Sequence, residues 1–303
     1  VKSEVFEDFT YPDYNAPVPY LLCLLQVGKV YIGSQMLDAM EGNWEQGVDG
    51  LLLHVSFMKK AVRGGRTLIL DLVTKALMRQ TLFGLNSLMN QPVFPKELYA
   101  KILRNLPPIE YEEYGSERQL LFEGFSISQG GEKHLLFQEN RTRQYFYDFF
   151  SRLIDSEKTA PYKWKLLSRD ELCVKKGIFW WLQNPAGKNY YAKRMEEQKN
   201  FKNFITSIQK SHFTKALYDM TRLSAELHMQ YREGKEVAAV LESLETYRSS
   251  VDPFSGKPYT WNDKKQILYS FGPDMVDDNG AVDYRKLHED NDIAVPVILY
   301  IAK

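Results

Sequence analysis

The sequence predicts a mainly α-helical protein with a small antiparallel β module at its C-terminal end. Over most of the first 190 residues, apolar side chains recur at three- and four-residue steps, which is the period of an α-helix. Residues 189–233 contain no Gly or Pro, whereas residues 252–296 are rich in turn residues and short β-forming runs. We therefore expect an α+β arrangement, with a multi-helix domain at residues 1–188 and a long helix plus β module at residues 189–303.

The overall composition is that of a folded protein and narrows the choice of partners. The chain is 44% hydrophobic and 26% charged, and its 39 basic residues balance its 39 acidic residues. The net charge therefore gives no reason to expect a nucleic acid or an anionic membrane as a partner. No run of about 18 apolar residues is present, so no membrane span is predicted. The chain begins with Val1 instead of Met, which is consistent with a missing N-terminal leader or anchor.

Four helices are predicted after a Pro-rich arm at residues 1–19. They cover residues 20–40, 44–63, 67–89 and 95–103, with Gly42-Asn43, Gly64-Gly65 and Pro92 as breaks and Thr67 as an N-cap. In the third helix, Leu68, Leu72 and Ala76 are expected to face the core, followed by Leu82 and Leu85. Such short breaks indicate antiparallel neighbours. Residues 41–47 resemble a tetratricopeptide turn, but no 34-residue repeat supports a repeat array.

Two further helices are predicted before the expected domain junction. The fifth covers residues 109–125, and the sixth covers residues 140–156 and carries an aromatic stripe that favours core packing over a cofactor site. Residues 161–188 contain Pro161, Pro185 and the pair Trp180-Trp181, which is typical of an irregular junction. A binding groove formed by the Trp pair is the alternative interpretation.

One long amphipathic helix is predicted from residue 189 to about residue 233, with a candidate break near Ser211 and Gly234 as its C-cap. A short helix at residues 237–247 leads into the β module. The two cysteines, Cys23 and Cys173, both lie among apolar neighbours, so we expect buried free thiols. They predict neither a disulfide nor a metal site.

Most catalytic motifs are absent from the sequence. There is no phosphate-binding Gly-rich loop with a Lys and no His-Glu-x-x-His, and residues 124–128 lack the last Gly of a Gly-x-Ser-x-Gly elbow. The five histidines are scattered and are expected on the surface or as hydrogen-bonded core residues: His54, His134, His212, His228 and His288. Glu112, Glu113 and Glu117 favour a solvated acidic face over a general-acid pair.

The C-terminal loop is the exception, because it concentrates oxygen ligands. Its acidic residues are Asp274, Asp277, Asp278, Asp283, Glu289, Asp290 and Asp292. Carboxylates at this density repel one another unless water or a cation lies between them. Calcium prefers such oxygens in a tolerant geometry, although the spacing is not that of an EF-hand. The sequence therefore predicts a calcium site, with a solvated loop as the alternative.

The order of features in the last hundred residues resembles the C-terminal module of the major pseudopilins of type II secretion. The resemblance rests on Asp252-Pro-Phe-Ser-Gly-Lys-Pro-Tyr259, on Tyr269-Ser-Phe-Gly-Pro-Asp274 and on Asn291-Asp292-Ile293. A similar cassette ends large bacterial envelope proteins that have helical N-terminal regions. The resemblance implies calcium ligands at Asp274, Asp278 and Asp292, with Asp277 and Asp290 as further candidates. It also implies a bacterial cell envelope or periplasmic location and a protein partner there.

This chain departs from the pseudopilin pattern in its helix, which is internal, charged and preceded by about 190 residues. Assembly into a pseudopilus is therefore not expected. The sequence supports a non-enzymatic envelope protein with a cation-stabilised module and a helical binding or packing surface. The alternative is an enzyme, such as a hydrolase, with a site in the cleft between the helical domain and the β module.

Overall fold

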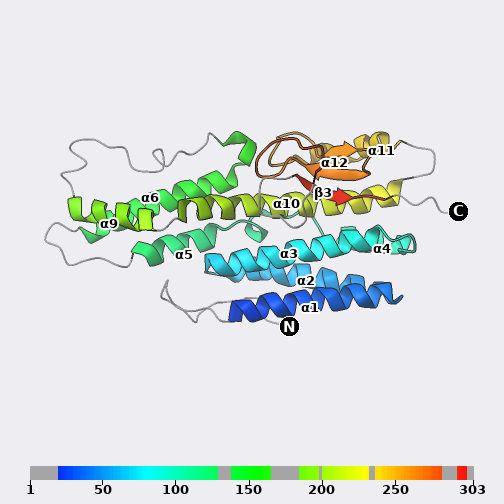
Figure 1. The fold of residues 1–303 in the computed structure, drawn as a ribbon, viewed down its shortest axis with the longest axis horizontal. Helices are drawn as coiled ribbons and strands as arrows, with labels where there is room; N and C mark the ends of the chain where they lie inside the picture. Colours follow the sequence, from blue (N-terminus) through cyan, green and yellow to red (C-terminus); the bar gives the residue numbers. More distant parts are fainter. Residues whose placement is uncertain are drawn as a thin grey trace.

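The computed structural model describes residues 20–128, 138–164, 184–197, 200–231, 236–281 and 292–298. Its N-terminal part is a set of neighbouring helices: α1 (Tyr20–Met40), α2 (Trp44–Gly64), α3 (Leu68–Met89) and α4 (Lys96–Asn105). Thr67 caps α3, because its hydroxyl accepts a hydrogen bond from the backbone N–H of Leu70 at 3.3 Å. Helix α1 packs against both α2 and α3, and Figure 1 shows it at one edge of the molecule.

The next segment is not the single fifth helix expected at residues 109–125. A short 3₁₀ helix, η1 (Tyr111–Glu113), is followed by a turn, and α5 (Glu117–Ser128) begins only after it. Gly115 causes the separation: a Cβ atom there would lie 2.5 Å from the Tyr111 ring. The aromatic helix α6 (Glu139–Lys158) follows with η2 (Pro161–Lys163), as expected for residues 140–156.

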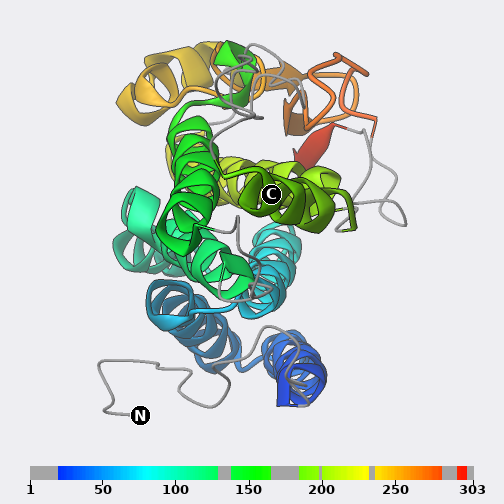
Figure 2. The same cartoon turned by 90° about the vertical axis from the view of Figure 1, so that its left-hand side faces the viewer.

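The long helix α10 (Asn200–Gln230) lies at the centre of the fold and is preceded by α9 (Pro185–Glu197). It is unbroken at Ser211, contrary to the candidate break there. It contacts α3, α4, α6 and the C-terminal strand, and Figure 2 shows the layers stacked from α1 through α3 and α10 to the C-terminal module. The described residues form two hydrophobic clusters, one around α5, α6 and α9 and one around α1–α4 and the β module. Helix α10 contributes to both, and a boundary at residues 188 and 189 stays a prediction.

The C-terminal module begins with two short helices, α11 (Val237–Ser243) and α12 (Glu245–Ser249), where one was expected. It continues with an antiparallel sheet of β1 (Thr260–Asn262), β2 (Ile267–Ser270) and β3 (Ile293–Pro296), in which β2 is central. Leu268 pairs with Trp261 on one side and Val295 on the other. The mainly α-helical class with a small antiparallel module is thereby confirmed.

The module is fastened to the helices by specific contacts. The buried Asn90, at the end of α3, donates to the carbonyl oxygen of Pro296 at 2.7 Å and accepts from the N–H of Ile298. The fully buried Tyr259 donates its hydroxyl to Asp219 of α10 at 3.1 Å. These contacts close loops of many residues, so the module and the helical layers support each other.

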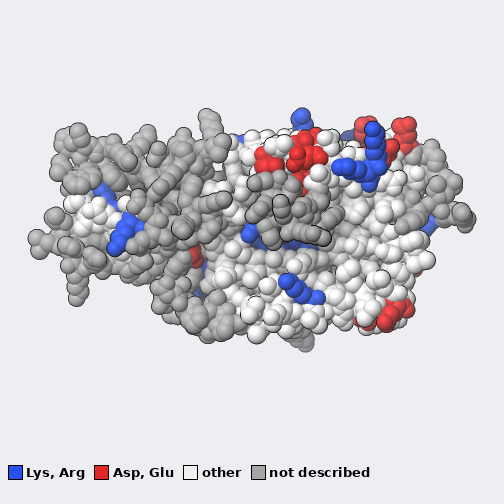
Figure 3. All heavy atoms as spheres, in the orientation of Figure 1, with Lys and Arg blue, Asp and Glu red and all other residues white. Residues whose placement is uncertain are grey.

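The molecular surface differs between its two long edges. Acidic and basic side chains both lie over the C-terminal module, whereas fewer charged side chains are visible along the edge formed by α1 (Figure 3). Leu22, Val30 and Met40 of α1 are exposed. Cys23 is also an exposed free thiol, so the expectation of a buried one was wrong for this residue; Cys173 lies outside the described residues. No helix in the described part of the chain is long and apolar enough to cross a membrane.

Candidate functional site

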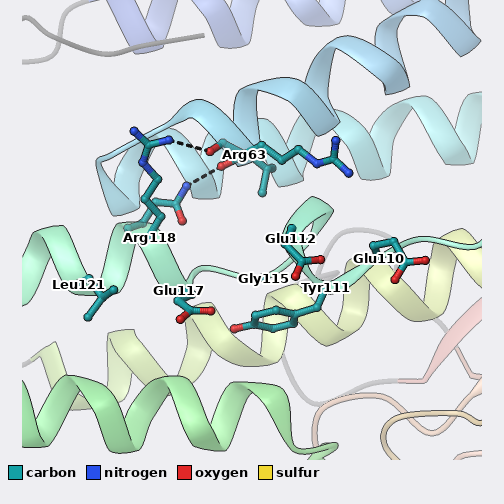
Figure 4. A pocket seen from close by; sticks show the side chains of 10 residues that line it. Arg63, Glu110, Tyr111, Glu112, Gly115, Glu117, Arg118 and Leu121 are labelled. Atoms are coloured by element: carbon teal, nitrogen blue, oxygen red, sulfur yellow. Dashed lines mark hydrogen bonds between the residues drawn. The ribbon is translucent and has the colours of Figure 1, made fainter. Parts of the chain in front are cut away.

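A pocket of about 690 Å³ lies between the end of α2, η1 and the first turns of α5, and we call it the α2–α5 pocket. Its size falls within the range of small-molecule sites. Figure 4 shows Arg63 and Arg118 along one wall and Tyr111, Glu112 and Glu117 along the other, with Gly115 between them. Val62 and Leu121 add apolar surface. The site therefore combines both signs of charge with an aromatic ring and aliphatic walls.

Most charges around the α2–α5 pocket are already paired. Glu113 accepts from Lys59 at 2.8 Å and from Arg63 at 2.9 Å. Glu117 pairs with Lys158 at 2.9 Å. The ammonium of Lys158 also lies over the Tyr111 ring, 5.7 Å from its centroid. These pairs leave few groups free to meet a ligand.

Among the described residues, Arg118 and Glu112 have no ion-pair partner, and we call their charges uncommitted. Arg118 is exposed, and its guanidinium donates at 3.2 Å to the backbone carbonyl oxygen of Arg63, with no carboxylate partner in the described part of the chain. Glu112 is exposed and has no hydrogen-bond or ion-pair partner among those residues. A guanidinium has five donors in a fixed plane, so Arg118 keeps most of its capacity for a carboxylate ligand.

A buried polar cluster fixes the wall of the α2–α5 pocket from behind. Glu157 of α6 accepts the backbone N–H of Ser116 with both carboxylate oxygens, at 2.9 and 2.8 Å. It also accepts the Tyr111 hydroxyl at 2.7 Å. The same carboxylate receives the hydroxyl of Ser211 from α10 at 2.7 Å. Because Tyr111 and Ser116 flank the turn at Gly115, Glu157 holds that turn in one conformation.

Lys75 of α3 completes this buried cluster. Its ammonium donates to Asp71 at 2.8 Å, to Ser116 at 2.6 Å and to Ser211 at 2.7 Å, which uses all three of its N–H groups. Ser116 in turn donates to Asp71 at 2.9 Å. Lys75, Ser116, Ser211 and Glu157 are 0% exposed and Asp71 is 1% exposed. No substrate can reach these hydroxyl and ammonium groups in this conformation, so the cluster supports structure instead of catalysis.

Burial also sets the protonation of this region. It raises the pKa of Asp71, against the lowering effect of Lys75, and the charge of Glu157 raises it further. Burial likewise raises the pKa of the Tyr111 hydroxyl, and Glu157 adds to the effect. Tyr111 therefore stays a neutral hydrogen-bond donor to Glu157 at physiological pH.

Sequence reasoning missed this buried cluster, although it had marked two of the pocket's carboxylates, Glu112 and Glu117. A signal was present in α3: Asp71 and Lys75, spaced i and i+4, continue the buried stripe of Met78, Leu82 and Leu85. The predicted face of Leu68, Leu72 and Ala76 is only half-buried in the first half of α3. The partners Ser116, Glu157 and Ser211 come from three other segments and carried no local signal.

The predicted calcium ligands lie near the edge of the sheet, but the described ones do not form a cluster. Asp292 is 2% exposed and accepts the backbone N–H groups of Asp278 at 3.1 Å and Gly280 at 2.7 Å with one oxygen. Among the described residues, its other oxygen is buried without a hydrogen-bond partner. The exposed Asp277 accepts the Tyr269 hydroxyl at 3.0 Å, and Asp274 accepts the N–H of Val276 at 3.1 Å. Asp290 lies outside the described residues.

These positions give limited support for a cation. Among the residues described, no three carboxylate, imidazole or thiol groups are arranged to hold a metal ion. Of the described acidic residues in this loop, Asp292 fits a ligand role, because one of its oxygens is buried without a partner there. Burial raises the pKa of Asp292 to about 6, and the negative charges of Asp278 and Asp277 contribute. A cation beside this carboxylate would offset that cost.

The motif around Asp252 has a structural explanation. The buried Asp252 accepts hydrogen bonds from the backbone N–H groups of Phe254 and Ser255, both at 3.1 Å, and from the Ser270 hydroxyl at 2.6 Å. It thereby joins the Pro-rich turn to β2. Gly256 has a φ of +71° and lies under the Tyr162 ring, where a Cβ would approach to 2.6 Å.

The described histidines do not form a site. His54 is buried, and its Nδ1 lies 2.7 Å from the Thr81 hydroxyl, which itself donates to the Leu77 carbonyl. Nδ1 of His54 therefore carries the proton. His212 is 3% exposed, and neither of its ring nitrogens has a hydrogen-bond partner among the described residues, so the expectation of a surface or hydrogen-bonded histidine does not hold in that part of the chain. His228 stacks on Tyr99, and His134 and His288 lie outside the described residues.

Comparisons with family models, curated proteins and solved structures gave no match. The resemblance of the last hundred residues to pseudopilin modules, and the Trp180-Trp181 groove, which lies outside the described residues, therefore stay predictions from the sequence.

Proposed function

We propose that this chain is a non-enzymatic binding protein that holds a small ligand in the α2–α5 pocket. The observation that carries the proposal is a pocket with two uncommitted charges, Glu112 in η1 and Arg118 in the first turn of α5, on either side of the Gly115 turn that Glu157 holds from behind. Preorganised walls of this kind reduce the entropy lost on binding.

The pocket geometry favours binding over catalysis. Lys75 and the hydroxyls of Ser116 and Ser211, which could act as base and nucleophiles if they were accessible, are fully buried and hydrogen-bonded to each other. At the contact between the helical domain and the β module, where the enzyme alternative requires a site, the buried Asn90 of α3 is bonded to the carbonyl oxygen of Pro296. This contact favours a packed interface there.

The C-terminal module is proposed to be a structural appendage that a calcium ion stabilises. Asp274, Asp278 and Asp292 would hold the ion, and the orphaned oxygen of Asp292 is the feature of the structure that supports it. A location in the bacterial cell envelope and a protein partner there belong to the same proposal and rest on the resemblance alone.

A thermal-shift screen of small polar metabolites tests the binding function. Leu121 is 40% exposed at the pocket wall, so Leu121→Trp should obstruct the pocket without disturbing the core. Phe125, one turn further along α5 and 60% exposed, gives the matched control Phe125→Trp. Compounds that raise the melting temperature of the wild type and of Phe125→Trp, but not of Leu121→Trp, support the proposal. It is wrong if no compound stabilises the protein, or if the shifts survive Leu121→Trp.

A further inference from the structure

The uncommitted charges of the α2–α5 pocket indicate the class of its ligand. Four cations and four carboxylates surround the turn: Lys59, Arg63, Arg118, Lys158, Glu110, Glu112, Glu113 and Glu117. Glu113 pairs with both Lys59 and Arg63 through its two oxygens, and Glu117 pairs with Lys158. Glu110 and Glu113 form a capping box at η1, in which the Glu110 side chain accepts a backbone N–H. Among the described residues, the Glu112 side chain is then left without a partner and the Arg118 guanidinium without a carboxylate.

We propose that the α2–α5 pocket binds a zwitterion, an amino acid or short peptide with a free carboxylate and a free ammonium group. This inference rests on the binding function proposed above and names its ligand. Arg118 pairs with the ligand's carboxylate, and Glu112 pairs with its ammonium group. A ligand with a single charge satisfies only one of the two groups, whereas a zwitterion satisfies both.

The positions of the two groups fit this assignment. Arg118 rises from the first turn of α5 to the end of α2, and Glu112 lies on the opposite wall (Figure 4). Both are solvent-exposed in the described structure, so their desolvation occurs only when the ligand supplies a partner. A guanidinium meets a carboxylate with two parallel hydrogen bonds, which fixes the orientation of the ligand.

The apolar part of the pocket favours a ligand with an aliphatic side chain. Val62, Leu121 and the ring of Tyr111 line the space between the two charged walls. At about 690 Å³ the pocket exceeds what a single amino acid fills, and it has room for two or three residues. Leucine and the peptides Leu-Leu and Leu-Leu-Leu are therefore the probes of choice.

Calorimetric titration with end-blocked peptides tests the zwitterion directly. Leu-Leu with free ends should bind, and N-acetylation or C-terminal amidation should each weaken binding by at least about tenfold. Free leucine and Leu-Leu-Leu, run beside it, separate an amino-acid site from a peptide site. Each block removes one of the two proposed ion pairs and leaves the side chains unchanged.

Two variants assign the ends of the ligand to their partners. In Glu112→Gln, N-acetylation of the peptide should no longer weaken binding, whereas C-terminal amidation should still weaken it. In Arg118→Gln the reverse should hold. Glu41→Gln and Arg104→Gln are the controls, because both residues are exposed and lie outside the pocket, and they should bind like the wild type.

The possible results separate this inference from the binding function. If blocked peptides bind as tightly as free ones and Leu121→Trp still abolishes binding, the pocket binds a ligand but the zwitterion assignment is wrong. If no free-ended probe gives saturable binding, the assignment is also wrong, and the metabolite screen decides the binding function independently. If N-acetylation and amidation weaken peptide binding to Glu112→Gln and Arg118→Gln as much as they weaken binding to the wild type, the two residues are only solvated surface charges.

Discussion

At the scale of single residues, Lys75 connects α3 to the Ser116 turn and to α10. Its fully buried ammonium donates directly to the Asp71 carboxylate and to the hydroxyls of Ser116 and Ser211. Ser211 in turn donates to the carboxylate of Glu157. Such a group gives limited net stability when paired but leaves an uncompensated charge when a partner is removed. It therefore fixes how α3, α6 and α10 meet, and through Glu157 it fixes the pocket wall.

Lys75→Met should lower the free energy of unfolding by about 3–5 kcal/mol, because Asp71 and Glu157 then remain buried without a cation. Urea unfolding measures the change. Lys101→Met is the control, since Lys101 pairs with Glu45 and Asp49 at the surface and its loss should have little measurable effect. Equal effects of the two substitutions would contradict the role assigned to the buried cluster.

Asp292 should destabilise the fold when it is ionised. Burial raises its pKa to about 6, above the value near 4 of an unfolded chain. The folded protein then binds the additional proton between pH 4 and pH 6, so the stability contributed by this group falls as the pH rises through that window. Asp292→Asn should remove this loss, which amounts to at most roughly 3 kcal/mol at pH 7. Unfolding of both proteins in chelator from pH 4 to pH 8 measures it.

Calcium should reverse that loss in the wild type only. If Asp292 is a ligand, added calcium raises the melting temperature of the wild type above pH 6 and leaves Asp292→Asn unchanged. Asp263→Asn, an exposed substitution in the same module, should respond like the wild type. A calcium response that survives in Asp292→Asn, or none in the wild type, rules out the proposed cation site.

At the scale of elements, turn residues and capping explain which expectations held. The helices at residues 20–40 and 44–63 were predicted closely, because Gly42, Gly64 and their neighbours end them locally. The split at Gly115 was missed, since it depends on the approach of the Tyr111 ring. Helix α10 continues through Ser211, whose hydroxyl is bonded to Lys75 and Glu157, partners more than 50 residues away.

The Asp252 turn should be the element on which the module depends most. Asp252→Ala leaves the N–H groups of Phe254 and Ser255 and the Ser270 hydroxyl without their acceptor, and we expect a loss of about 2–4 kcal/mol. Asp252→Asn keeps one acceptor oxygen and should lose less. Denaturant unfolding of the two variants gives the comparison, and a loss in Asp252→Ala below about 1 kcal/mol would show that the turn is held by packing alone.

At the scale of the whole molecule, the sequence predicts the class but not the site. Periodicity and turn residues are local, and they are sufficient for a mainly helical protein with a small β module. The α2–α5 pocket requires Arg63, Tyr111 and Arg118 to meet, and its support spans 136 residues between Lys75 and Ser211. Contacts of that range arise from tertiary packing, which no single stretch of sequence specifies.

The buried histidines should make the molecule sensitive to acid. Burial lowers the pKa of His54 and His228 to about 4 and that of His212 to about 3. The unfolded chain, with histidine pKa values near 6.5, binds more protons in this range, so stability falls as the pH drops below 6.5. The melting temperature should decrease between pH 6.5 and pH 4. His212→Leu should reduce that decrease in melting temperature. If the variant loses as much melting temperature as the wild type over this pH range, the buried His212 is not a cause of the acid sensitivity.

A methyl NMR titration with Leu-Leu tests the central claim of binding without turnover most directly. We expect saturable shifts of the Val62 and Leu121 methyl signals, no shifts at the exposed Leu53 and Val93, which do not line the pocket, and ligand signals that stay intact for hours. Conversion of the peptide to leucine would support the enzyme alternative. Shifts confined to residues outside the α2–α5 pocket would contradict the site.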